Sequence, residues 1–484
     1  MINWRIISKI IGSLLFIEAF FMGCCMAMAL SFHEDDALAF MVSTLFTFSG
    51  AFLFLFFGRE AENSLSRRDA YVVVTLTWVV FSFFGMFPFL IHGSVAGVTD
   101  AYFETMSGFT TTGATIIDDV EALPHGLLFW RSLMQWIGGL GIVFFTIAIL
   151  PSLVGGSVKV FAAEATGPMR SKMHPRLSTS AKWIWSIYLL LTVACALSFW
   201  LAGMGWFDAT NYSMSTTATG GFSTHNGTIF LAKPSIEYLA ILFQFLAGIN
   251  FTLLYVSVFK LKFGSLFRNS EFKMYVATIL GATLWIMYLL ITRLDYSIEP
   301  AFRSALFQVV SFITTTGLSN TDAGAWPHIT WVILMLLMFM GACAGSTTGG
   351  FKSIRVLMLL KVLRNEFRHI LHPNAVLPVK MSGQSIPQGR LVTLLAFITI
   401  YVIMLLATAT VINASGVDIT NAMTISLSLI SNVGAGLDTN IGPQMSWADL
   451  SWGIKWLCSF LMLVGRLEII AVLVLFTRSF WKEN

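Results

Sequence analysis

The sequence predicts an all-α polytopic membrane protein with four helix-pore-helix repeats around one central ion pore, preceded by two extra N-terminal transmembrane helices. Three observations support this fold class. The 484 residues are 56% hydrophobic and 11% charged, and a soluble protein has about twice that charged fraction. Several apolar stretches are long enough to cross a bilayer. Four short segments rich in threonine and glycine recur at similar intervals.

Ten apolar stretches are candidate membrane helices, because a helical span needs roughly 20 apolar residues. They lie near residues 10–31, 37–58, 70–91, 127–150, 183–204, 235–259, 273–292, 329–359, 391–413 and 452–477. Arg5 and Lys9 before the first stretch give it some likeness to a signal peptide. Its apolar run continues to Phe32 and is too long for a signal core, so we interpret it as a retained helix.

The basic residues predict the orientation of the chain. Most of the 29 Lys and Arg residues fall on the two ends and on every second connection. Cytoplasmic connections retain positive charge, so both termini are expected in the cytoplasm. The net charge of +4 therefore reports topology. No basic patch is interleaved with aromatic residues, which argues against a nucleic-acid partner.

The chain divides into an N-terminal two-helix element and four repeats. The predicted boundaries are 1–68 for the element, then 69–180, 181–270, 271–389 and 390–484 for the repeats. Each repeat holds an apolar segment too short to span, near 99–110, 207–217, 300–313 or 420–431. Asp100, Asp208, Glu299 and Thr420 are expected to cap these half-helices.

A Thr/Gly motif follows each half-helix. Aligned on their first glycines, Gly113, Gly220, Gly317 and Gly434, the motifs lie 107, 97 and 117 residues apart. Irregular backbone at membrane depth is tolerated only when it is buried in protein or lines water. Ion filters use rings of backbone carbonyls, and glycine accepts the positive φ that such rings require. Four ordinary extracellular loops would not be expected to share this register.

The motifs predict a filter for a monovalent cation, since no carboxylate lies within them. The expected ion-binding residues are Thr111, Thr112 and Gly113; Ala218, Thr219 and Gly220; Thr315, Thr316 and Gly317; and Asn432, Val433 and Gly434. Acids follow three of the motifs, at Asp118, Asp119, Glu121, Asp322 and Asp438. They either concentrate cations at the outer mouth or form a solvated loop face.

A gate is expected just inside the filter. Gly341, Gly345, Gly349 and Gly350 interrupt the span 329–359, and each costs a helix about 1 kcal/mol relative to alanine. The alternative is a small-residue helix face that packs closely. Arg466 lies midway along the last span, where arginine is costly, so a functional role is the default interpretation. We assign the loop 341–350, Lys352 and Arg466 to the gate, with Arg466 facing the pore.

Further motifs carry a family resemblance. They are Trp130 and Arg131, with residues 135–139, 221–225, 341–347, 372–376 and 465–468. Together with the repeats, they resemble the TrkH/TrkG potassium-uptake proteins of the Trk/Ktr/HKT superfamily. The two extra N-terminal helices are more similar to TrkH than to KtrB. Ala218 and Asn432 depart from the threonines of the other repeats, Thr111 and Thr315.

The resemblance implies potassium as the transported ion and a potassium-selective, channel-like homodimer in the bacterial cytoplasmic (inner) membrane. It also implies a cytosolic nucleotide-binding regulatory subunit of the TrkA type, with the nucleotide on that partner and no bound cofactor on this chain. An ion-coupled secondary transporter, moving potassium with protons or sodium, is the alternative. An enzyme is not expected, because no cluster of His, Cys or acidic residues and no nucleophile–base pair is recognisable.

Overall fold

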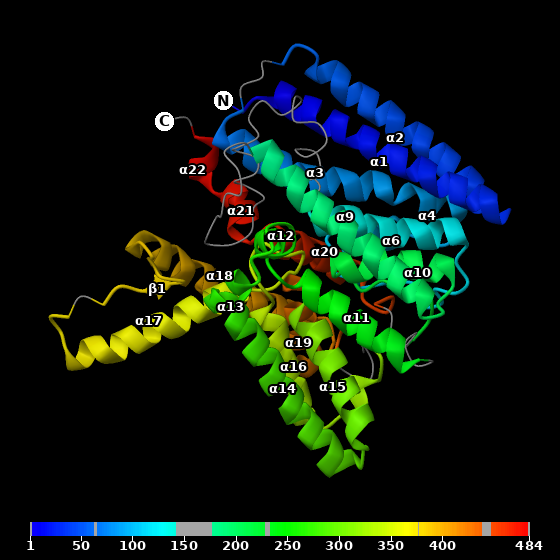
Figure 1. Cartoon of the computed structure of the whole chain (residues 1–484). Coiled ribbons are helices and arrows are strands. Elements are labelled where there is room, and N and C mark those ends of the chain that lie inside the picture. Colours follow the sequence, from blue (N-terminus) through cyan, green and yellow to red (C-terminus); the bar gives the residue numbers. More distant parts are fainter. Residues whose placement is uncertain are drawn as a thin grey trace.

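The fold is known from a computed structural model, which describes residues 2–61, 65–141, 177–227, 233–375, 377–437 and 447–482. Nearly all regular structure in these residues is helical (Figure 1). The exception is a small antiparallel hairpin of β1 (Lys380–Met381) and β2 (Gln384–Ser385). Apolar helices long enough to cross a bilayer are numerous. The prediction of an all-α polytopic membrane protein is confirmed.

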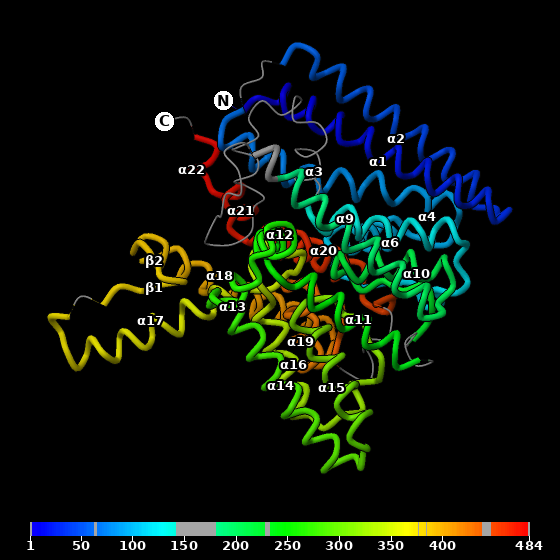
Figure 2. The backbone as a smooth tube through the Cα atoms, in the orientation of Figure 1, coloured from blue at the N-terminus to red at the C-terminus, as the bar shows by residue number. Residues whose placement is uncertain are grey.

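The N-terminal element is a pair of long helices, α1 (Trp4–Phe32) and α2 (Asp36–Gly58), packed lengthwise on one side of the body (Figure 1). α1 also contacts α3 (Arg67–Gly85) and α6 (His125–Gly139). The two ends of the chain lie close together (Figure 2). Arg68 near the start of α3 donates a hydrogen bond to the carbonyl of Lys482, at 2.8 Å.

Four short helices occupy the positions of the predicted half-helices, each within two residues of the expected bounds. They are α5 (Val98–Phe109), α10 (Trp206–Ala218), α15 (Ile298–Ile313) and α19 (Ile419–Ile430). The expected caps are wrong. Asp100, Asp208, Glu299 and Thr420 lie inside the first turns, and the cap positions hold Gly97, Gly205, Ser297 and Asp418. Acids in a first turn favour the helix dipole without capping a backbone amide.

Longer helices flank these four pore helices. The preceding helices are α3 with α4 (Phe87–His92), α9 (Leu177–Leu201), α14 (Ser270–Leu294) and α18 (Gln388–Ala414). The following helices are α6, α11 (Pro234–Ala247) with α12 (Phe251–Phe259), α16 (His328–Met340), and α20 (Trp452–Arg466) with α21 (Ile470–Leu473). The remaining elements are α13 (Gly264–Arg268), η2 (Ala323–Ala325), α17 (Ser353–Leu371), η3 (Val474–Phe476) and α22 (Arg478–Trp481).

The packing of the pore helices closes a ring. Each pore helix contacts the flanking helices of its own repeat and the second helix of the preceding repeat. The contacts between repeats are α10 on α6, α15 on α11, α19 on α16 and α5 on α20. Because the last repeat packs on the first, the chain surrounds a single axis.

Three predicted spans are not continuous helices. α11 and α12 bend by 104°, and α20 and α21 by 110°. The stretch 329–359 is also not one span, because α16 ends at Met340 and α17 begins at Ser353. Asn250 explains one break, since its side chain accepts from the amides of Thr252 and Leu253 and starts a new helix. Of the predicted span 127–150, residues 142–150 lie outside the described residues.

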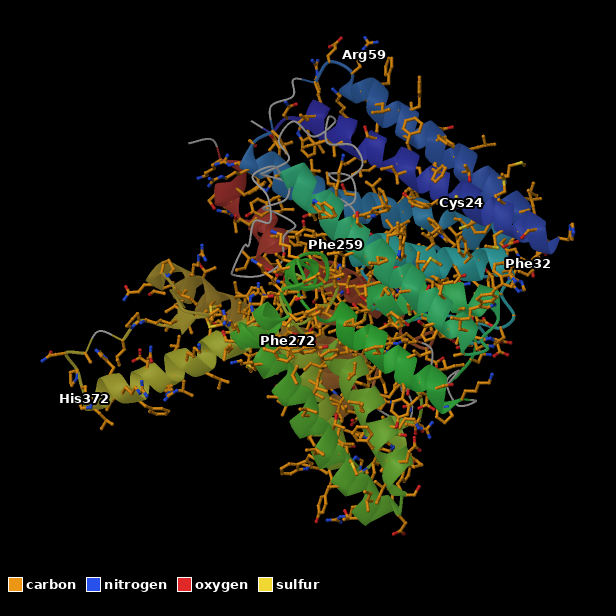
Figure 3. The ribbon with its side chains drawn as sticks, viewed as in Figure 1. Cys24, Phe32, Arg59, Phe259, Phe272 and His372 are labelled. Carbon is orange, nitrogen blue, oxygen red and sulfur yellow. The ribbon has the colours of Figure 1, made fainter. Side chains whose placement is uncertain are left out.

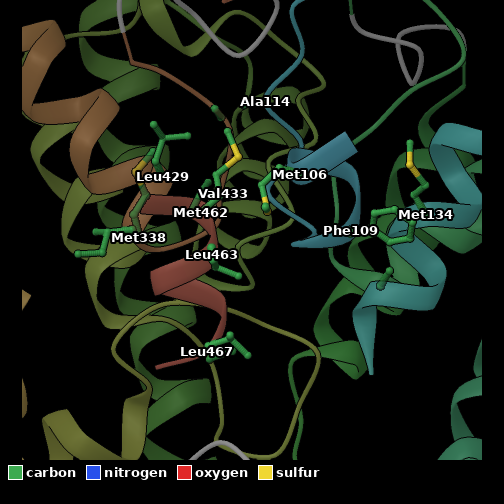
Figure 4. Packing of buried hydrophobic residues seen from close by; sticks show 14 of the residues in the cluster. Met106, Phe109, Ala114, Met134, Met338, Leu429, Val433, Met462, Leu463 and Leu467 are labelled. Carbon is green, nitrogen blue, oxygen red and sulfur yellow. The ribbon is translucent and has the colours of Figure 1, made fainter. Parts of the chain in front are cut away.

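Buried apolar side chains from the pore helices and their neighbours pack around the Thr/Gly motifs (Figure 4). Phe109 at the end of α5 is fully buried near Met134 of α6. Val433, inside the fourth motif, is also fully buried. This core holds the irregular segments at the centre of the molecule.

Candidate functional site: a ring of four backbone segments

Each pore helix ends in the same way. The residue after the last turn adopts a left-handed conformation: φ is 54° at Thr111, 54° at Thr219, 55° at Thr315 and 55° at Asn432. The following amide then reaches back to the carbonyl of a serine five residues earlier. These bonds join Thr112 to Ser107 (2.9 Å), Gly220 to Ser215 (2.9 Å), Thr316 to Ser311 (2.9 Å) and Val433 to Ser428 (2.8 Å). This is the Schellman arrangement of a helix terminus.

The four chain reversals define the register of the motifs. Two residues beyond each left-handed residue is a glycine with positive φ: 83° at Gly113, 86° at Gly221, 74° at Gly317 and 74° at Gly434. The second strand is therefore Thr219, Gly220 and Gly221, one residue later than the alignment on first glycines predicted. Ala218 is the last residue of α10 and corresponds to Thr110. Three repeats thus share a threonine at the left-handed position, and only Asn432 departs.

The glycines bring the four strands into a closed ring. A Cβ added to Gly113 would lie 2.2 Å from the carbonyl oxygen of Gly220. The corresponding distances are 2.2 Å from Gly221 to Thr316 O, 2.2 Å from Gly317 to Val433 O, and 2.1 Å from Gly434 to Thr112 O. Each glycine therefore touches the backbone of the next repeat, in the order one, two, three, four and back to one. No side chain fits at these positions.

Most carbonyl oxygens of the four strands have no hydrogen-bond donor among the described residues. Within the described part of the chain, the carbonyls of the three residues in each strand accept no hydrogen bond, with one exception. The exception is Gly220, whose carbonyl accepts from Gln135 Nε2 at 2.7 Å. Buried carbonyls are nearly always paired in proteins, so a ring of unpaired ones indicates a site for a donor or a cation.

Several threonine hydroxyls of the motifs make hydrogen bonds within the protein. Thr110 Oγ1 donates to the carbonyl of Met106 and contacts Thr112 Oγ1 at 2.8 Å. Thr314 repeats this pattern, with Thr316 Oγ1 also at 2.8 Å. The main-chain oxygens of the strands are therefore the groups with the fewest bonds to the protein.

α6 supports the ring from behind through an ion pair that is almost fully buried. Arg131 Nε lies 2.9 Å from Glu104 Oε1, with side chains 2% and 0% exposed. Glu104 also accepts from Thr115 Oγ1 and the amide of Ile116, at 3.0 Å. Arg131 donates to the carbonyl of Ser223 at 2.9 Å, which links the first motif to the second. Sequence reasoning did not single out Glu104, since one acid in an apolar helix carries no spacing signal.

The loop between α16 and α17 lies against the ring. The amide of Gly349 donates to Thr315 Oγ1 at 2.8 Å, and Thr347 Oγ1 is 3.4 Å from Thr219 Oγ1. A Cβ on Gly349 would lie 2.1 Å from the carbonyl oxygen of Ser431. The loop thus contacts three of the four repeats at the left-handed residues or the residue before them. Gly341, Gly345 and Gly350 have positive φ, as does Lys352, so the insert is non-helical as expected.

Arg466, at the end of α20, fastens this loop to α6. Its guanidinium donates to the carbonyl of Thr347 at 2.8 Å and to those of Gly138 and Gly139 at 2.5 and 2.6 Å. A cation at the carboxyl end of a helix is favoured by the helix dipole. Lys352 Nζ bonds to the carbonyl of Thr348 within the loop.

Two acids anchor the surroundings of the loop. Glu271 Oε1, at the start of α14, accepts from the amide of Ala344 at 2.6 Å. Glu468 Oε2 pairs with Arg355 at 2.5 Å. The predicted gate residues are therefore brought together, although their role in gating stays a prediction.

The acids expected near the outer mouth take part in local bonding. Asp119 accepts from Asn226 at 2.6 Å, Glu121 contacts His225 at 3.2 Å, and Asp322 caps η2 through the amide of Gly324. Asp118 is exposed, and Asp438 lies outside the described residues. Cation attraction and a solvated face both stay predictions for these acids.

Comparison with known proteins identifies the family. Residues 38–483 match the model of the TrkH family, described as cation transport proteins. The chain is 36% identical to the Trk system potassium uptake protein TrkH of Halomonas elongata and covers 99% of both chains. It is 35% identical to that of Escherichia coli K12, over 99% of this chain and 100% of the relative.

A solved structure gives the same result. The fold matches the crystal structure of the potassium transporter TrkH from Vibrio parahaemolyticus with a TM-score of 0.90 and 34% identity. The match covers 99% of this chain and 100% of the other. A multi-pass transport protein, and not an enzyme, is thus the correct class. The chain belongs to the TrkH family of cation transport proteins.

Proposed function

We propose that this protein mediates potassium uptake by channel-like permeation through a filter formed by strands 111–113, 219–221, 315–317 and 432–434. The observation that carries this function is the closed ring of glycines, in which every strand carbonyl except that of Gly220 lacks a donor among the described residues. Neutral carbonyl rings replace the hydration shell of a monovalent cation. The pore is built by the repeats 69–180, 181–270, 271–389 and 390–484. The names of the relatives support potassium as the ion.

The substitution Gly113→Ser tests the filter. A Cβ there would lie 2.2 Å from the carbonyl oxygen of Gly220, at a φ of 83°. The serine should displace one carbonyl and lower the permeability ratio of potassium to sodium in proteoliposomes. Gly416→Ser is the control, since its φ is 100° but a Cβ there would touch nothing. Unchanged selectivity in Gly113→Ser would exclude this ring as the filter.

Ion-coupled secondary transport makes a different prediction for the same vesicles. Permeation through an open filter needs only a potassium gradient, whereas coupled transport needs protons or sodium as well. Potassium uptake should persist when the proton and sodium gradients are both abolished. Uptake that stops under those conditions would favour the coupled transporter.

We propose that the loop 341–350, Lys352 and Arg466 form the gate of this filter. The loop lies against the left-handed residues of the ring, and Arg466 holds it there through Thr347. Arg466→Ala removes three hydrogen bonds to carbonyls and a charge that opposes cations. Potassium flux should rise in this variant and in one with a shortened loop, whereas Arg478→Ala at the exposed end of the chain should leave it unchanged. Wild-type flux in both gate variants would reject the assignment.

We further propose that the protein works as a homodimer in the bacterial inner membrane, with both termini and the basic connections in the cytoplasm. That face would receive a TrkA-type regulatory subunit, which would carry the nucleotide. Support comes from the family and from the distribution of Lys and Arg. Co-purification with a soluble nucleotide-binding protein, and nucleotide-dependent flux only in its presence, would support this arrangement. Flux that ignores deletion of the subunit would contradict it.

A further inference from the structure

A basic pocket opens where the second and third repeats are joined. It has a volume of about 540 Å³ and is lined by Lys262, Gly264, Ser265, Arg268, Asn269 and Ser382. α13 supplies Gly264, Ser265 and Arg268, and the turn between β1 and β2 supplies Ser382. Figure 3 labels Phe259 and Phe272, which lie on either side of this connection, near the end of α12 and the start of α14.

Two basic side chains, those of Lys262 and Arg268, line the pocket. Within the described residues, neither the ammonium of Lys262 nor the guanidinium of Arg268 has an acidic partner or a hydrogen bond. Both residues are exposed. The hydroxyls of Ser270 and Ser382 meet at 3.0 Å beside them and hold the hairpin turn against α14. An anion in the pocket would therefore meet two free positive charges.

Apolar side chains beside the pocket also point away from the protein. Leu261 is 76% exposed, Phe263 55% and Phe267 67%. Large apolar residues gathered beside free cations suit the boundary between acyl chains and headgroups. α14 begins at Ser270 and has the length and composition of a membrane span, so the pocket lies at the end of a span.

We infer that this pocket binds the headgroup of an anionic phospholipid, with Lys262 and Arg268 contacting its phosphate. Leu261, Phe263 and Phe267 would insert among the neighbouring acyl chains. Basic pockets at the cytoplasmic ends of membrane helices bind such headgroups. A free phosphate would satisfy the charges alone, but it would leave the three apolar side chains in water. The lipid explains both sets of residues.

The site does not depend on the filter. It does adjoin the proposed gate through α14, because Glu271 follows Ser270 directly and accepts from the amide of Ala344 in the loop. Because Arg268 and Asn269 directly precede α14, a lipid held there would fix the end of the helix that anchors the loop.

Native mass spectrometry of the purified full-length protein tests the site, with added phosphatidylglycerol, phosphatidylcholine or inorganic phosphate. The wild-type protein should retain phosphatidylglycerol in preference to phosphatidylcholine. The double variant Lys262→Gln/Arg268→Gln should bind phosphatidylglycerol about 30-fold more weakly, since two membrane-surface cations contribute about that factor. Binding of phosphatidylcholine should not change.

The control Lys182→Gln/Lys260→Gln removes the same charge from exposed residues that do not line the pocket. It should retain the preference for phosphatidylglycerol. An equal loss in both double variants would overturn the inference in favour of diffuse attraction. Displacement of the lipid by millimolar inorganic phosphate would overturn it in favour of a soluble anion. Lipid binding is measured without ion flux, so a failure of the proposed filter would leave this result interpretable.

Discussion

Gly220 and Gly221 are neighbours with different constraints. Gly221 has a φ of 86°, and a Cβ there would meet the backbone carbonyl of Thr316 at 2.2 Å. At Gly220 the φ is not in the left-handed region, and a Cβ would meet the side chain of Gln135 at 2.4 Å. A side chain can move, whereas a carbonyl in a closed ring moves only with its strand. The second glycine is therefore the one that the ring requires.

Gly221→Ala should reduce the selectivity for potassium over sodium as strongly as Gly113→Ala, because both displace a carbonyl of the next repeat. Gly220→Ala should have a weaker effect, which a second substitution, Gln135→Ala, should relieve by removing the obstructing side chain. Permeability ratios of the four variants and the double variant would measure this. A larger effect at Gly220 than at Gly221 would restore the register expected from the first glycines.

The sequence contains a spacing that indicates this register, although an alignment on the first glycines does not use it. Each of Gly113, Gly221, Gly317 and Gly434 follows a serine by six residues. The serine carbonyl closes the helix terminus, so this spacing reflects backbone geometry. An alignment on the first glycine of a Gly-Gly pair misses it by one residue. The presence of the four strands was predictable from composition, but the choice between adjacent glycines depended on φ.

At the scale of elements, α6 connects the two N-terminal helices, the ring and the loop. Its first turn is capped by two acids at the junction of α1 and α2: Glu34, in the turn, accepts from the amide of His125 at 2.6 Å, and Asp36, the first residue of α2, from that of Leu127 at 3.1 Å. Its middle supplies Arg131 and Gln135 behind the ring. Its last carbonyls accept from Arg466. The N-terminal helices thus help to position a helix on which the site depends.

Asp36→Ala should destabilise the protein by about 1 kcal/mol, because a buried helix amide loses its cap. Asp35→Ala is the matched control, since the side chain of Asp35 is 87% exposed and, among the described residues, contacts His92 alone, at 3.3 Å. Equilibrium denaturation in mixed micelles would compare the two variants. Equal stabilities would show that Glu34 alone is sufficient to cap α6.

The elements differed in how well the sequence predicted them. The pore helices were predicted within two residues, because a short apolar segment ending in a Thr/Gly motif marks both of their ends. The breaks after α11 and α20 were missed. A mean hydropathy over about 20 residues stays high across such a break. The bends of 104° and 110° arise from local backbone geometry and polar contacts, which do not change that mean.

At the scale of the whole molecule, α17 and the β-hairpin extend away from the body, with His372 near the outer end (Figures 1 and 3). One face of α17 exposes large apolar residues: Leu360 (52%), Leu363 (52%), Phe367 (62%), Ile370 (73%) and Leu371 (74%). Large exposed apolar patches are often interaction surfaces, and we propose that this face is one. A second copy of the chain is the partner that the proposed homodimer supplies.

The double variant Phe367→Glu/Ile370→Glu should shift the purified protein from dimer to monomer, because it places two charges in the apolar contact. His369→Glu on the opposite face of the helix should leave the dimer intact. Light scattering coupled to size-exclusion chromatography would report the mass of each. A dimer that survives the double substitution would place the interface elsewhere.

Because the four repeats belong to one chain, a substitution can change one side of the ring and leave the other three sides unchanged. In a homotetramer, a substitution would be copied at every corner, so the symmetry of the opening could change only as a whole. Here Gln135 engages the carbonyl of Gly220 alone, while those of Thr112, Thr316 and Val433 accept nothing within the described residues. An ion at the centre would therefore face three carbonyls without another partner and one, that of Gly220, that already accepts a hydrogen bond from Gln135. A single point mutation in one repeat could therefore move a bound ion away from the centre of the ring.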